Sequence, residues 1–412
     1  MKICLISNLF PPHNRGGAEQ VVLNTLRGLK ERGHEVIIIT AGPLRVCRRM
    51  WHSATDPSSS LQPKAVIEDG VKVYRFFPLN LFFYGHDYRY PLAVRFFWHI
   101  LDTFNLHSYF LVKSILKKEK PDVVHTHNLK GIGYLIPLAL RSLGLRHIHT
   151  LHDVQLVNPS GIIIKGKEEP KGLKGFFFSI YARVCRFLFG SPEVIVSPSK
   201  FLLGFYKERG FFPKSNSMVI PNPVVVSAFS AKEPRVGFNF LYLGQIEEHK
   251  GVLFLIENFK KTMRRLTTQD VRLYIVGHGS KIEEAKNLAR DSSQIIFLGK
   301  VSREDLPSIF NQTDLMIVPS LCYENSPTVI FESFSYGVPV LASDIEGVAE
   351  LIKDGVNGFT FATSDSASLT KKLIFCLENR EKIDQMREAA RASVDGLDLN
   401  SYLDKVISLY EP

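Results

Sequence analysis

Short apolar segments alternate with amphipathic segments along most of the chain, as strands alternate with helices. Lys2 to Ser7 predicts a buried strand, Ala18 to Arg32 has helical spacing, and Glu35 to Thr40 predicts a second strand. A strand, a helix and a strand in this order form a βαβ unit with parallel strands. The same alternation returns in the second half, from the strand Phe240 to Leu243 onward. The pattern therefore predicts an α/β fold with two doubly wound parallel sheets.

Chain length and turn residues predict where these two sheets separate. The chain has 412 residues, more than a single core usually holds. Pro221-Asn222-Pro223 interrupts the pattern near a change of charge. Residues 1–233 hold 31 Lys and Arg against 16 Asp and Glu, whereas residues 234–412 hold 20 against 25. We expect an N-terminal domain over residues 1–222, a C-terminal domain over 223–395, and a last helix within 396–412 that crosses back to the first domain.

Composition indicates the class of protein and its compartment. With 45% hydrophobic and 22% charged residues, the chain has the composition of a soluble globular protein. Its five cysteines form no Cys-x-x-Cys pair, which favours a reduced cytoplasmic setting without a zinc or disulfide framework. The start of the chain lacks the basic region and cleavage site of a signal peptide, so we expect none, and no apolar run approaches the roughly 20 residues that span a bilayer. His147 and His149 alternate along a strand, but no carboxylate or cysteine follows at metal-ligand spacing, so we predict no metal site.

Aromatic and basic residues are interleaved in two regions of the first half, residues 74–109 and 165–189. No nucleic-acid motif accompanies this basicity, so we expect no nucleic-acid partner. One interpretation is contact with an anionic membrane surface, at the inner face of the membrane, where such side chains lie among lipid headgroups. The other is that the aromatic residues pack into the core or line a groove for an acceptor. The sequence leaves both interpretations open.

The stretch from Glu324 to Glu332 has the strongest chemical pattern in the chain. Asn325 or Ser326 is suited to cap a helix, Pro327 suits its first turn, and an apolar run follows. We therefore expect Glu324 in the loop before a helix and Glu332 on it. The start of a helix favours an anion such as a diphosphate, whereas carboxylates favour sugar hydroxyls. The combination predicts a nucleotide-sugar.

Other candidate residues follow predicted strands, at the carboxyl ends where open α/β sheets bind ligands. Gly17 lies in the first strand-to-helix turn, and His152 follows a strand beside Asp153. In the second half, Lys250 precedes a helix and is a suitable phosphate ligand, and Gly277 opens a Gly-x-Gly turn.

An ordered set of motifs then resembles a known family. The set is Gly16-Gly17-Ala18-Glu19, His152-Asp153, Pro221-Asn222, Gly244 with Lys250-Gly251, Gly277-x-Gly279 and Glu324-x7-Glu332. It is similar to the retaining glycosyltransferases of GT-B fold, in the family usually called family four or glycosyl transferases group 1. The resemblance implies two Rossmann-like domains that face a central cleft. It also implies that the second domain binds the nucleotide-sugar and the first binds the acceptor.

The resemblance further implies roles for single residues. His152 and Glu324 would be catalytic, with His152 near the reacting carbon and Glu324 on the donor sugar. The implied donor-binding residues are Gly17 over the phosphates, Lys250 and Gln245 near the diphosphate, Gly277 and Gly299 beside the base, Asn325, Ser326 and Thr328 near the sugar, and Glu332 on the ribose. The implied chemistry uses a UDP- or GDP-sugar as substrate, with no metal, no other cofactor and no covalent intermediate on the protein.

Two positions depart from the family pattern. Gln245 stands where the family commonly has Arg, and Pro221-Asn222-Pro223-Val224-Val225 replaces the usual Pro-Asn-Gly-Val-Asp. Three hypotheses therefore remain. The first is a transferase that acts on a lipid-linked or cell-envelope glycan. The second is another GT-B enzyme, with a soluble acceptor or as a nucleotide-sugar epimerase. The third is a non-catalytic nucleotide-sugar-binding protein, which Gln245 favours slightly.

Overall fold

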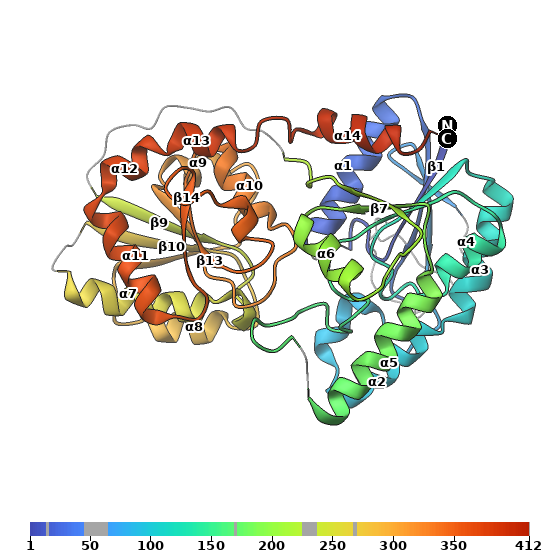
Figure 1. Ribbon diagram of the computed structural model, residues 1–412, viewed down its shortest axis with the longest axis horizontal. Helices are drawn as coiled ribbons and strands as arrows, with labels where there is room; N and C mark the ends of the chain where they lie inside the picture. The colour runs from blue at the N-terminus through green and yellow to red at the C-terminus, as the bar shows by residue number, and fades with distance from the viewer. Residues whose placement is uncertain (14–15, 45–64, 169–170, 225–236, 267–269, 412) are drawn as a thin grey trace, which may run out of the picture. The chain divides into compact units, whose positions relative to one another are not determined.

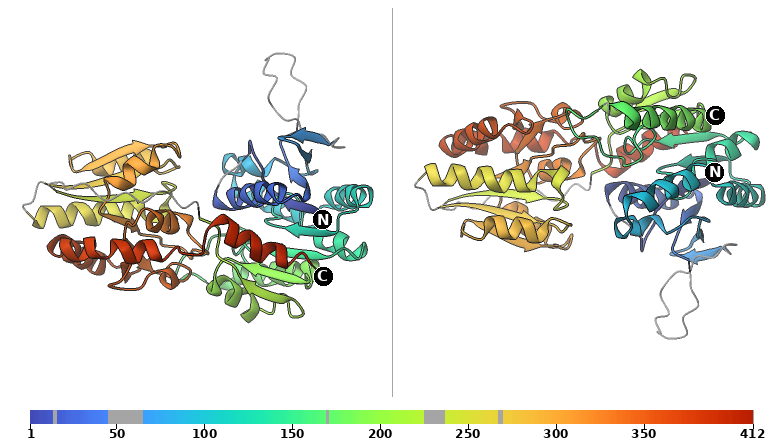
Figure 2. Two further views of the ribbon diagram at one scale, coloured as in Figure 1. Left: turned by 90° about the horizontal axis from the view of Figure 1, so that it is seen from above. Right: turned by 90° about the horizontal axis from the view of Figure 1, so that it is seen from below.

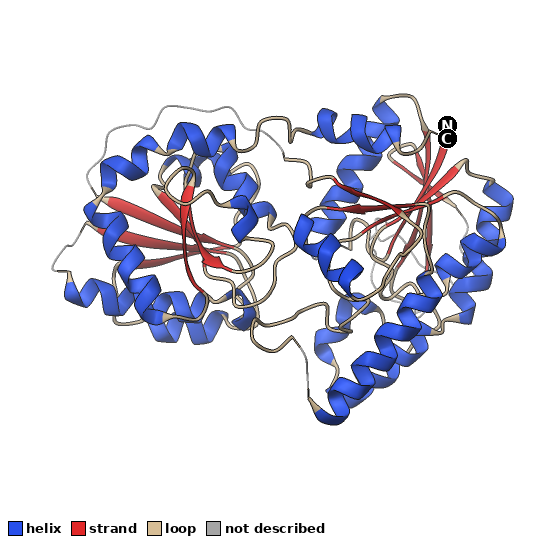
Figure 3. Ribbon diagram, viewed as in Figure 1, coloured by secondary structure: helices blue, strands red, loops and turns tan. Residues whose placement is uncertain are grey.

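The chain folds into two compact units (Figure 1). The computed structural model describes residues 1–13, 16–44, 65–168, 171–224, 237–266 and 270–411. Unit 1 comprises Met1–Gly161, Glu169–Pro221 and Leu399–Pro412, and unit 2 comprises Ile162–Glu168 and Asn222–Asp398. Each unit contains one mainly parallel sheet with helices around it, as Figure 3 shows. The predicted α/β class is confirmed.

Unit 1 contains an eight-stranded sheet within the described residues. Its strand order is β3-β4-β2-β1-β5-β6-β7-β8, and only the short β3 runs antiparallel to its neighbour. The register is continuous at the centre, where Cys4 of β1 lies between Ile37 of β2 and Val124 of β5. The strands are β1 Lys2–Ser7, β2 Glu35–Ala41, β3 Val66–Glu68, β4 Val71–Phe76, β5 Val123–Thr126, β6 His147–Thr150, β7 Val194–Ser197 and β8 Asn216–Val219.

Helices α1 and α14 pack on one face of this sheet. Val21, Leu26 and Leu29 of α1 and Tyr402, Leu403 and Val406 of α14 join the buried cluster of strand residues. Gly28 permits the contact, because a Cβ atom there would lie 2.0 Å from a methyl group of Leu403. The views from above and below show the remaining helices of the unit (Figure 2). The helices are α1 Gly17–Glu31, η1 Tyr84–Arg89, α2 Leu92–Thr103, α3 Leu106–Glu119, α4 Ile136–Ser142, α5 Gly172–Phe189, α6 Lys200–Glu208 and α14 Leu399–Ser408.

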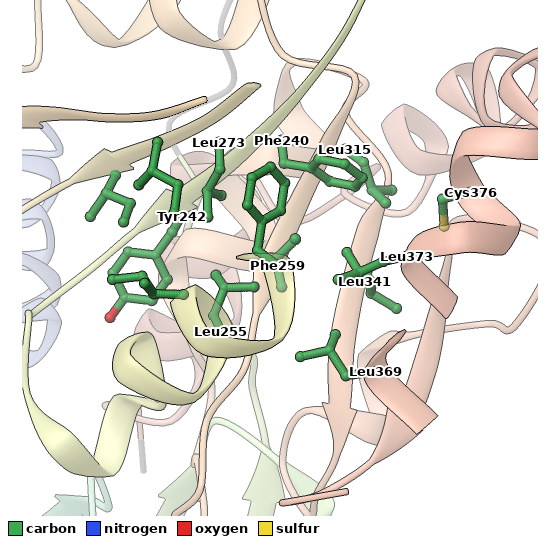
Figure 4. Close-up of a cluster of buried hydrophobic side chains, with 14 of the residues drawn as sticks. Phe240, Tyr242, Leu255, Phe259, Leu273, Leu315, Leu341, Leu369, Leu373 and Cys376 are labelled. Carbon is green, nitrogen blue, oxygen red and sulfur yellow. The ribbon is translucent and has the colours of Figure 1, made fainter. Parts of the chain in front are cut away.

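Unit 2 contains a parallel six-stranded sheet in its described part, in the order β11-β10-β9-β12-β13-β14. Alternate side chains of each strand point to opposite faces. Phe240 and Leu273 therefore join α7, α8 and α11 in one core, drawn in Figure 4, while Leu241 and Met316 join α9, α10 and α13 in the other. The strands are β9 Phe238–Leu243, β10 Val271–Val276, β11 Ile295–Gly299, β12 Leu315–Val318, β13 Val340–Asp344 and β14 Gly358–Ala362.

The helical elements of unit 2 differ from the sequence prediction near the end of the unit. The charged, amphipathic pattern from about Ser366 to Ser393 predicts a single helix, and this prediction is wrong, because the segment forms three helices. Asn379 leaves helical backbone geometry and its amide donates to the Phe375 carbonyl oxygen (2.8 Å), which ends α11. The helical elements are η2 Glu248–Lys250, α7 Val252–Arg265, α8 Ile282–Ala289, α9 Leu306–Asn311, α10 Thr328–Ser335, η3 Ala349–Leu351, α11 Ser366–Glu378, α12 Arg380–Gln385 and α13 Arg387–Ala392.

Candidate active site

Four neighbouring strands of unit 2 end in the loops that carry the predicted donor-binding residues. Gln245 follows β9, Gly277 follows β10, and Gly299 ends β11. The loop after β12 carries Glu324 and leads into α10. Because β11, β10, β9 and β12 are adjacent in that order, their parallel carboxyl ends form one continuous edge.

Backbone hydrogen bonds join these loops into a single structure. The Gly277 N–H donates to the Gly299 carbonyl oxygen (2.8 Å), and the Gly244 N–H donates to that of Val276 (3.1 Å). The Leu321 N–H donates to the His249 carbonyl oxygen at 2.9 Å, which connects the loop after β12 to η2. The residues at this edge are therefore held by one another and not only by their own strands.

Glycine is required where these loops approach most closely. A Cβ atom on Gly277 would lie 1.8 Å from the Gly244 carbonyl oxygen, and one on Gly251 would lie 1.8 Å from that of Pro319. Both residues also have positive φ values, +140° and +73°, which L side chains rarely adopt. Gly299 differs, because nothing lies within 4 Å of its Cβ position. The first two glycines are therefore packing requirements of the site.

Lys250 and Glu324 form an ion pair at the centre of this edge. Lys250 Nζ lies 2.6 Å from Glu324 Oε1, and the Ser320 hydroxyl donates to the same oxygen at 2.7 Å. The side chains of Lys250 and Glu324 are 27% and 12% exposed. Burial alone would lower the pKa of Lys250, but the charge of Glu324 and its hydrogen bond outweigh burial and raise that pKa. Lys250 therefore stays a cation at neutral pH.

Helix α10 begins beside this pair, although not as the sequence predicts. The predicted cap by Asn325 or Ser326 is wrong, because Pro327 occupies the N-cap position and no side chain caps the helix. Thr328 is the first helical residue. The first N–H groups of a helix have no intrahelical acceptor, so this end presents donors and a positive dipole. The Ser326 hydroxyl oxygen is buried and has no hydrogen-bond partner among the described residues.

Glu332 lies on α10, as predicted. Its surroundings differ from those of Glu324, which is paired with Lys250. Within the described residues, no hydrogen bond from protein contributes to the pKa of its carboxylate. Burial raises the pKa of Glu332, and the charge of Arg303 opposes this effect only in part. A partly buried carboxylate without a protein donor is suited to accept hydrogen bonds from hydroxyl groups of a ligand.

The other predicted residues, Gly17 and His152, belong to unit 1. Gly17 starts α1 after the N-cap Gly16, whose N–H donates to the Glu19 carboxylate at 2.9 Å. His152 follows β6, and its Nε2 lies 2.9 Å from Nδ1 of the fully buried His127. Burial lowers the pKa of His152 to about 4, so its ring is neutral at pH 7. The roles predicted for both residues remain predictions.

His147 and His149 take part in a hydrogen-bond network in the sheet of unit 1. The Thr126 hydroxyl lies 2.8 Å from His147 Nε2 and 2.8 Å from His149 Nδ1. His125 contacts the Tyr410 and Thr150 hydroxyls, each at 2.7 Å. Among the described side chains, no group of three or more His, Cys, Asp or Glu residues is arranged to hold a metal ion.

Several residues of this site escape sequence reasoning. Ser320 is one, because its hydroxyl donates to Glu324. Its position four residues before Glu324 could have indicated this contact from the sequence. Glu247 is another, since its carboxylate accepts from the Ser280 N–H (2.7 Å) and hydroxyl (2.6 Å) and so connects the loops after β9 and β10. The third is the segment Ile162–Glu168, which follows β6 in sequence but packs within unit 2.

Comparisons with known proteins cover both halves of the chain. Residues 15–228 match the family described as Glycosyltransferase Family 4, and residues 229–393 match Glycosyl transferases group 1. The chain is 26% identical over 358 residues to an uncharacterized 42.6 kDa protein in the cps region of Klebsiella pneumoniae, covering 85% of this chain and 87% of that protein. It is 28% identical over 313 residues to UDP-Gal:alpha-D-GlcNAc-diphosphoundecaprenol alpha-1,3-galactosyltransferase of Escherichia coli, covering 72% and 76%.

Solved structures share the complete architecture at low sequence identity. Sucrose-phosphate synthase from Thermosynechococcus elongatus aligns with a TM-score of 0.74 and 17% identity over 99% of this chain and 98% of that one. Anabaena HepE in complex with UDP and glucose aligns with a TM-score of 0.70 and 16% identity over the same shares. These structures share the GT-B fold, and the family matches show that the chain belongs to glycosyltransferase family 4.

Proposed function

We propose that this protein transfers a sugar from a UDP- or GDP-sugar to a hydroxyl group of a lipid-linked or cell-envelope glycan, with retention of configuration and without a metal ion. The observation that carries the proposal is the Lys250–Glu324 pair beside the start of α10. It combines a cation and helix N–H groups, suited to a diphosphate, with a carboxylate suited to sugar hydroxyls. Glu332 adds a second carboxylate for the ribose.

The ion pair would be rearranged when the donor binds. Lys250 would turn from Glu324 toward the diphosphate, which carries more negative charge than one carboxylate. Glu324 would keep the hydrogen bond from Ser320 and could then accept hydrogen bonds from the donor sugar. Because Gln245 brings no charge, Lys250 would be the main cation for the phosphates.

The proposed transfer needs no covalent intermediate on the protein. The bond between the anomeric carbon and the β-phosphate oxygen breaks, and the acceptor hydroxyl oxygen bonds to the same carbon on the same face. The hydroxyl proton passes to the leaving phosphate oxygen, so the products are a glycoside and a nucleoside diphosphate. Lys250 and the first N–H groups of α10 would stabilise the negative charge that develops on the leaving group. His152 would contact the sugar near the reacting carbon.

A binding titration followed by a donor screen tests this proposal. We expect UDP or GDP to bind, and mass spectrometry to detect the free nucleotide when the matching nucleotide-sugar and an acceptor are added in EDTA. NMR of the product should show the anomeric configuration of the donor. Binding without release from any donor would favour the non-catalytic alternative that Gln245 suggests. Failure to bind either nucleotide would overturn the proposal.

A lipid-linked acceptor is supported by the surface of unit 1. Exposed apolar side chains occur on α2, α3 and α5 and at the end of α2, including Phe96, Phe97, Phe104, Phe110, Phe176, Phe177 and Phe187. Basic residues lie near them in sequence, among them Arg95 and Lys174. The Escherichia coli relative is named for a diphosphoundecaprenol substrate. Other aromatic residues of the same regions, such as Phe82, Trp98 and Phe189, are buried, so the core interpretation also holds for part of the set.

We therefore propose that this surface contacts anionic lipid. None of the helices in the described ranges is both long and apolar enough to cross a bilayer, so the contact would be interfacial. The protein should co-sediment with phosphatidylglycerol vesicles at low salt and be released at high salt. Phe176→Ser with Phe177→Ser should weaken sedimentation at least fivefold. Equal recovery in the supernatant with and without anionic vesicles would instead favour a soluble acceptor.

A further inference from the structure

One long connection of unit 1 enters unit 2 beside the candidate active site. Residues 151–171 join β6 to α5, and their part Ile162–Glu168 packs within unit 2. Connections of this length are uncommon and often functional. The same connection carries His152. A direct loop between β6 and α5 would not need to include a segment that packs within unit 2.

The 162–168 segment pairs with the backbone that leads to Glu324. Ile164 and Cys322 form an antiparallel bridge, with the Tyr323 N–H donating to the Ile163 carbonyl oxygen at 2.9 Å and the Lys165 N–H donating to that of Leu321 at 3.1 Å. The Ile163 side chain is 3% exposed and anchors the segment. The residue directly before Glu324 is therefore held by a backbone hydrogen bond from a distant part of the chain.

Two side chains strengthen this attachment. Lys165 Nζ donates to the Asp344 carbonyl oxygen at 2.7 Å and lies 3.5 Å from the Glu346 carboxylate. The Tyr323 hydroxyl donates to the Glu168 carboxylate at 2.8 Å. Burial would raise the pKa of Glu168, but hydrogen bonds from the Gly166 N–H and Tyr323 help to lower it, so this acceptor stays ionised.

Lys165 also contacts the second backbone stretch that holds Glu324. The Glu324 N–H donates to the Glu346 carbonyl oxygen at 3.3 Å. The adjacent Gly347 packs so closely that a Cβ atom there would lie 1.4 Å from the Glu324 carbonyl oxygen. Glu324 is thus held between the loop after β13 and residues 321–323, and the 162–168 segment contacts both.

We infer that Lys165 and Tyr323 are positioning residues that hold the Glu324 carboxylate in its catalytic place, with the 162–168 segment as a structural part of the donor site. The inference rests on the proposed function, because it assigns Glu324 to the transferred sugar. Lys165 donates to the Asp344 carbonyl oxygen and Tyr323 to the Glu168 carboxylate, so both would position Glu324 through the backbone. Displacement of a catalytic group by about 1 Å can cost up to a hundredfold in rate.

Kinetics of matched variants test the inference. We expect Lys165→Ala and Tyr323→Phe each to lower kcat about tenfold, with the donor KM within about twofold of wild type. Lys165→Arg should restore kcat, because Arg can also donate to Asp344 and pair with Glu346. Lys167→Ala is the matched control, since Lys167 is exposed and its side chain forms no hydrogen bond or ion pair among the described residues. Wild-type kcat in both Lys165→Ala and Tyr323→Phe would overturn the inference.

Hydrogen exchange separates this inference from the proposed function. Lys165→Ala should speed amide exchange in residues 321–324 at least fivefold, whereas Lys167→Ala should leave it unchanged. If the wild-type protein releases no nucleotide from any donor, the proposed function fails. Amide exchange still tests whether the 162–168 segment holds residues 321–324 in place. Unchanged exchange in Lys165→Ala would show that the loop does not depend on Lys165 and would overturn the inference.

Discussion

The two sheets place their polar residues in different positions, within the strands in unit 1 and beyond the strand ends in unit 2. In unit 1, His125, His147 and His149 are buried within the strands and are bonded to hydroxyl groups. In unit 2, Lys250 of η2 and Glu324 of the loop after β12 lie beyond the strands, form an ion pair and are partly exposed. The same parallel architecture therefore supports a neutral network inside one sheet and a charged pair at the edge of the other. Acid should therefore destabilise the network of unit 1, whereas removal of a charge should lower the activity that depends on the pair in unit 2.

The largest expected effect is the loss of unit 1 in acid. Burial lowers the pKa of His125 and of His149 to about 3, and those of His127 and His147 well below their usual value. The unfolded chain binds these protons near pH 6.5 and the folded chain does not, so stability is full above pH 6.5 and falls as pH falls. Four such groups can remove up to about 5 kcal/mol per pH unit. Circular dichroism should show partial unfolding near pH 5.

Exchange of backbone amides identifies which unit unfolds at that pH. Strands β5 and β6 should lose protection before β9 and β10, because the four buried histidines belong to unit 1. Simultaneous loss of protection in both sheets, or stability that does not change between pH 7 and pH 5, would contradict the contrast between the units.

Removal of the charge in unit 2 should have the next largest effect. Lys250→Ala leaves Glu324 without its cation and the diphosphate without its main partner, so transfer should fall about 10²- to 10³-fold. Glu324→Gln should lower transfer by a similar factor while the melting temperature stays near that of wild type. Lys286→Ala, which removes a surface pair with Glu283, is the control and should keep full activity. Normal activity in either site variant would reject the assignment.

Substitution of the site glycines should have a smaller effect, and that effect should be on the free energy of unfolding. Gly277→Ala places a methyl group 1.8 Å from a backbone oxygen at a φ of +140°, so the loops after β9 and β10 must separate. We expect a loss of about 3 kcal/mol in a denaturant titration and weaker nucleotide binding. Gly299→Ala is the matched control, with open space at its Cβ position and an expected cost of about 1 kcal/mol. Equal losses would show that close packing is not the cause.

The smallest of these effects concerns the neutral network itself. Thr126→Val keeps the shape of the side chain but removes the hydroxyl that contacts both His147 and His149. Leaving buried nitrogens without a partner should cost about 2 kcal/mol at pH 7. Thr126→Ser retains the hydroxyl and should recover most of that stability. A Val variant as stable as wild type would mean that the hydroxyl contributes nothing to unit 1.

Much of the fold was accessible from the sequence because the strands are strongly apolar. Segments such as Ile3 to Ser7 and Leu315 to Val318 are buried along their whole length, so their pattern is unambiguous. Glu324 lies in the loop after β12, as predicted, and Lys250 lies in η2 after β9, just before α7. The helix cap was missed because Pro327 itself can take the N-cap position, and the break at Asn379 depends on a single side-chain hydrogen bond.

Contacts between distant residues could not be predicted in the same way. Ile164 pairs with Cys322, and Thr126 binds His147 and His149, but no local pattern at either partner indicates the other. The glycine requirement at Gly251 likewise depends on the carbonyl oxygen of Pro319. These features depend on the tertiary structure, which the local periodicity of the sequence does not predict.

Each of the two units includes a segment from the other half of the chain, so the halves should not fold well when they are expressed separately. A fragment that begins at Asn222 would lack Ile162–Glu168, and an amino-terminal fragment that stops at Pro221 would lose α14 from the face it shares with α1. Each half would then expose apolar surface that the intact chain covers. Chimaeras that exchange acceptor specificity between related enzymes should therefore carry both pieces across together with the half to which they belong in space.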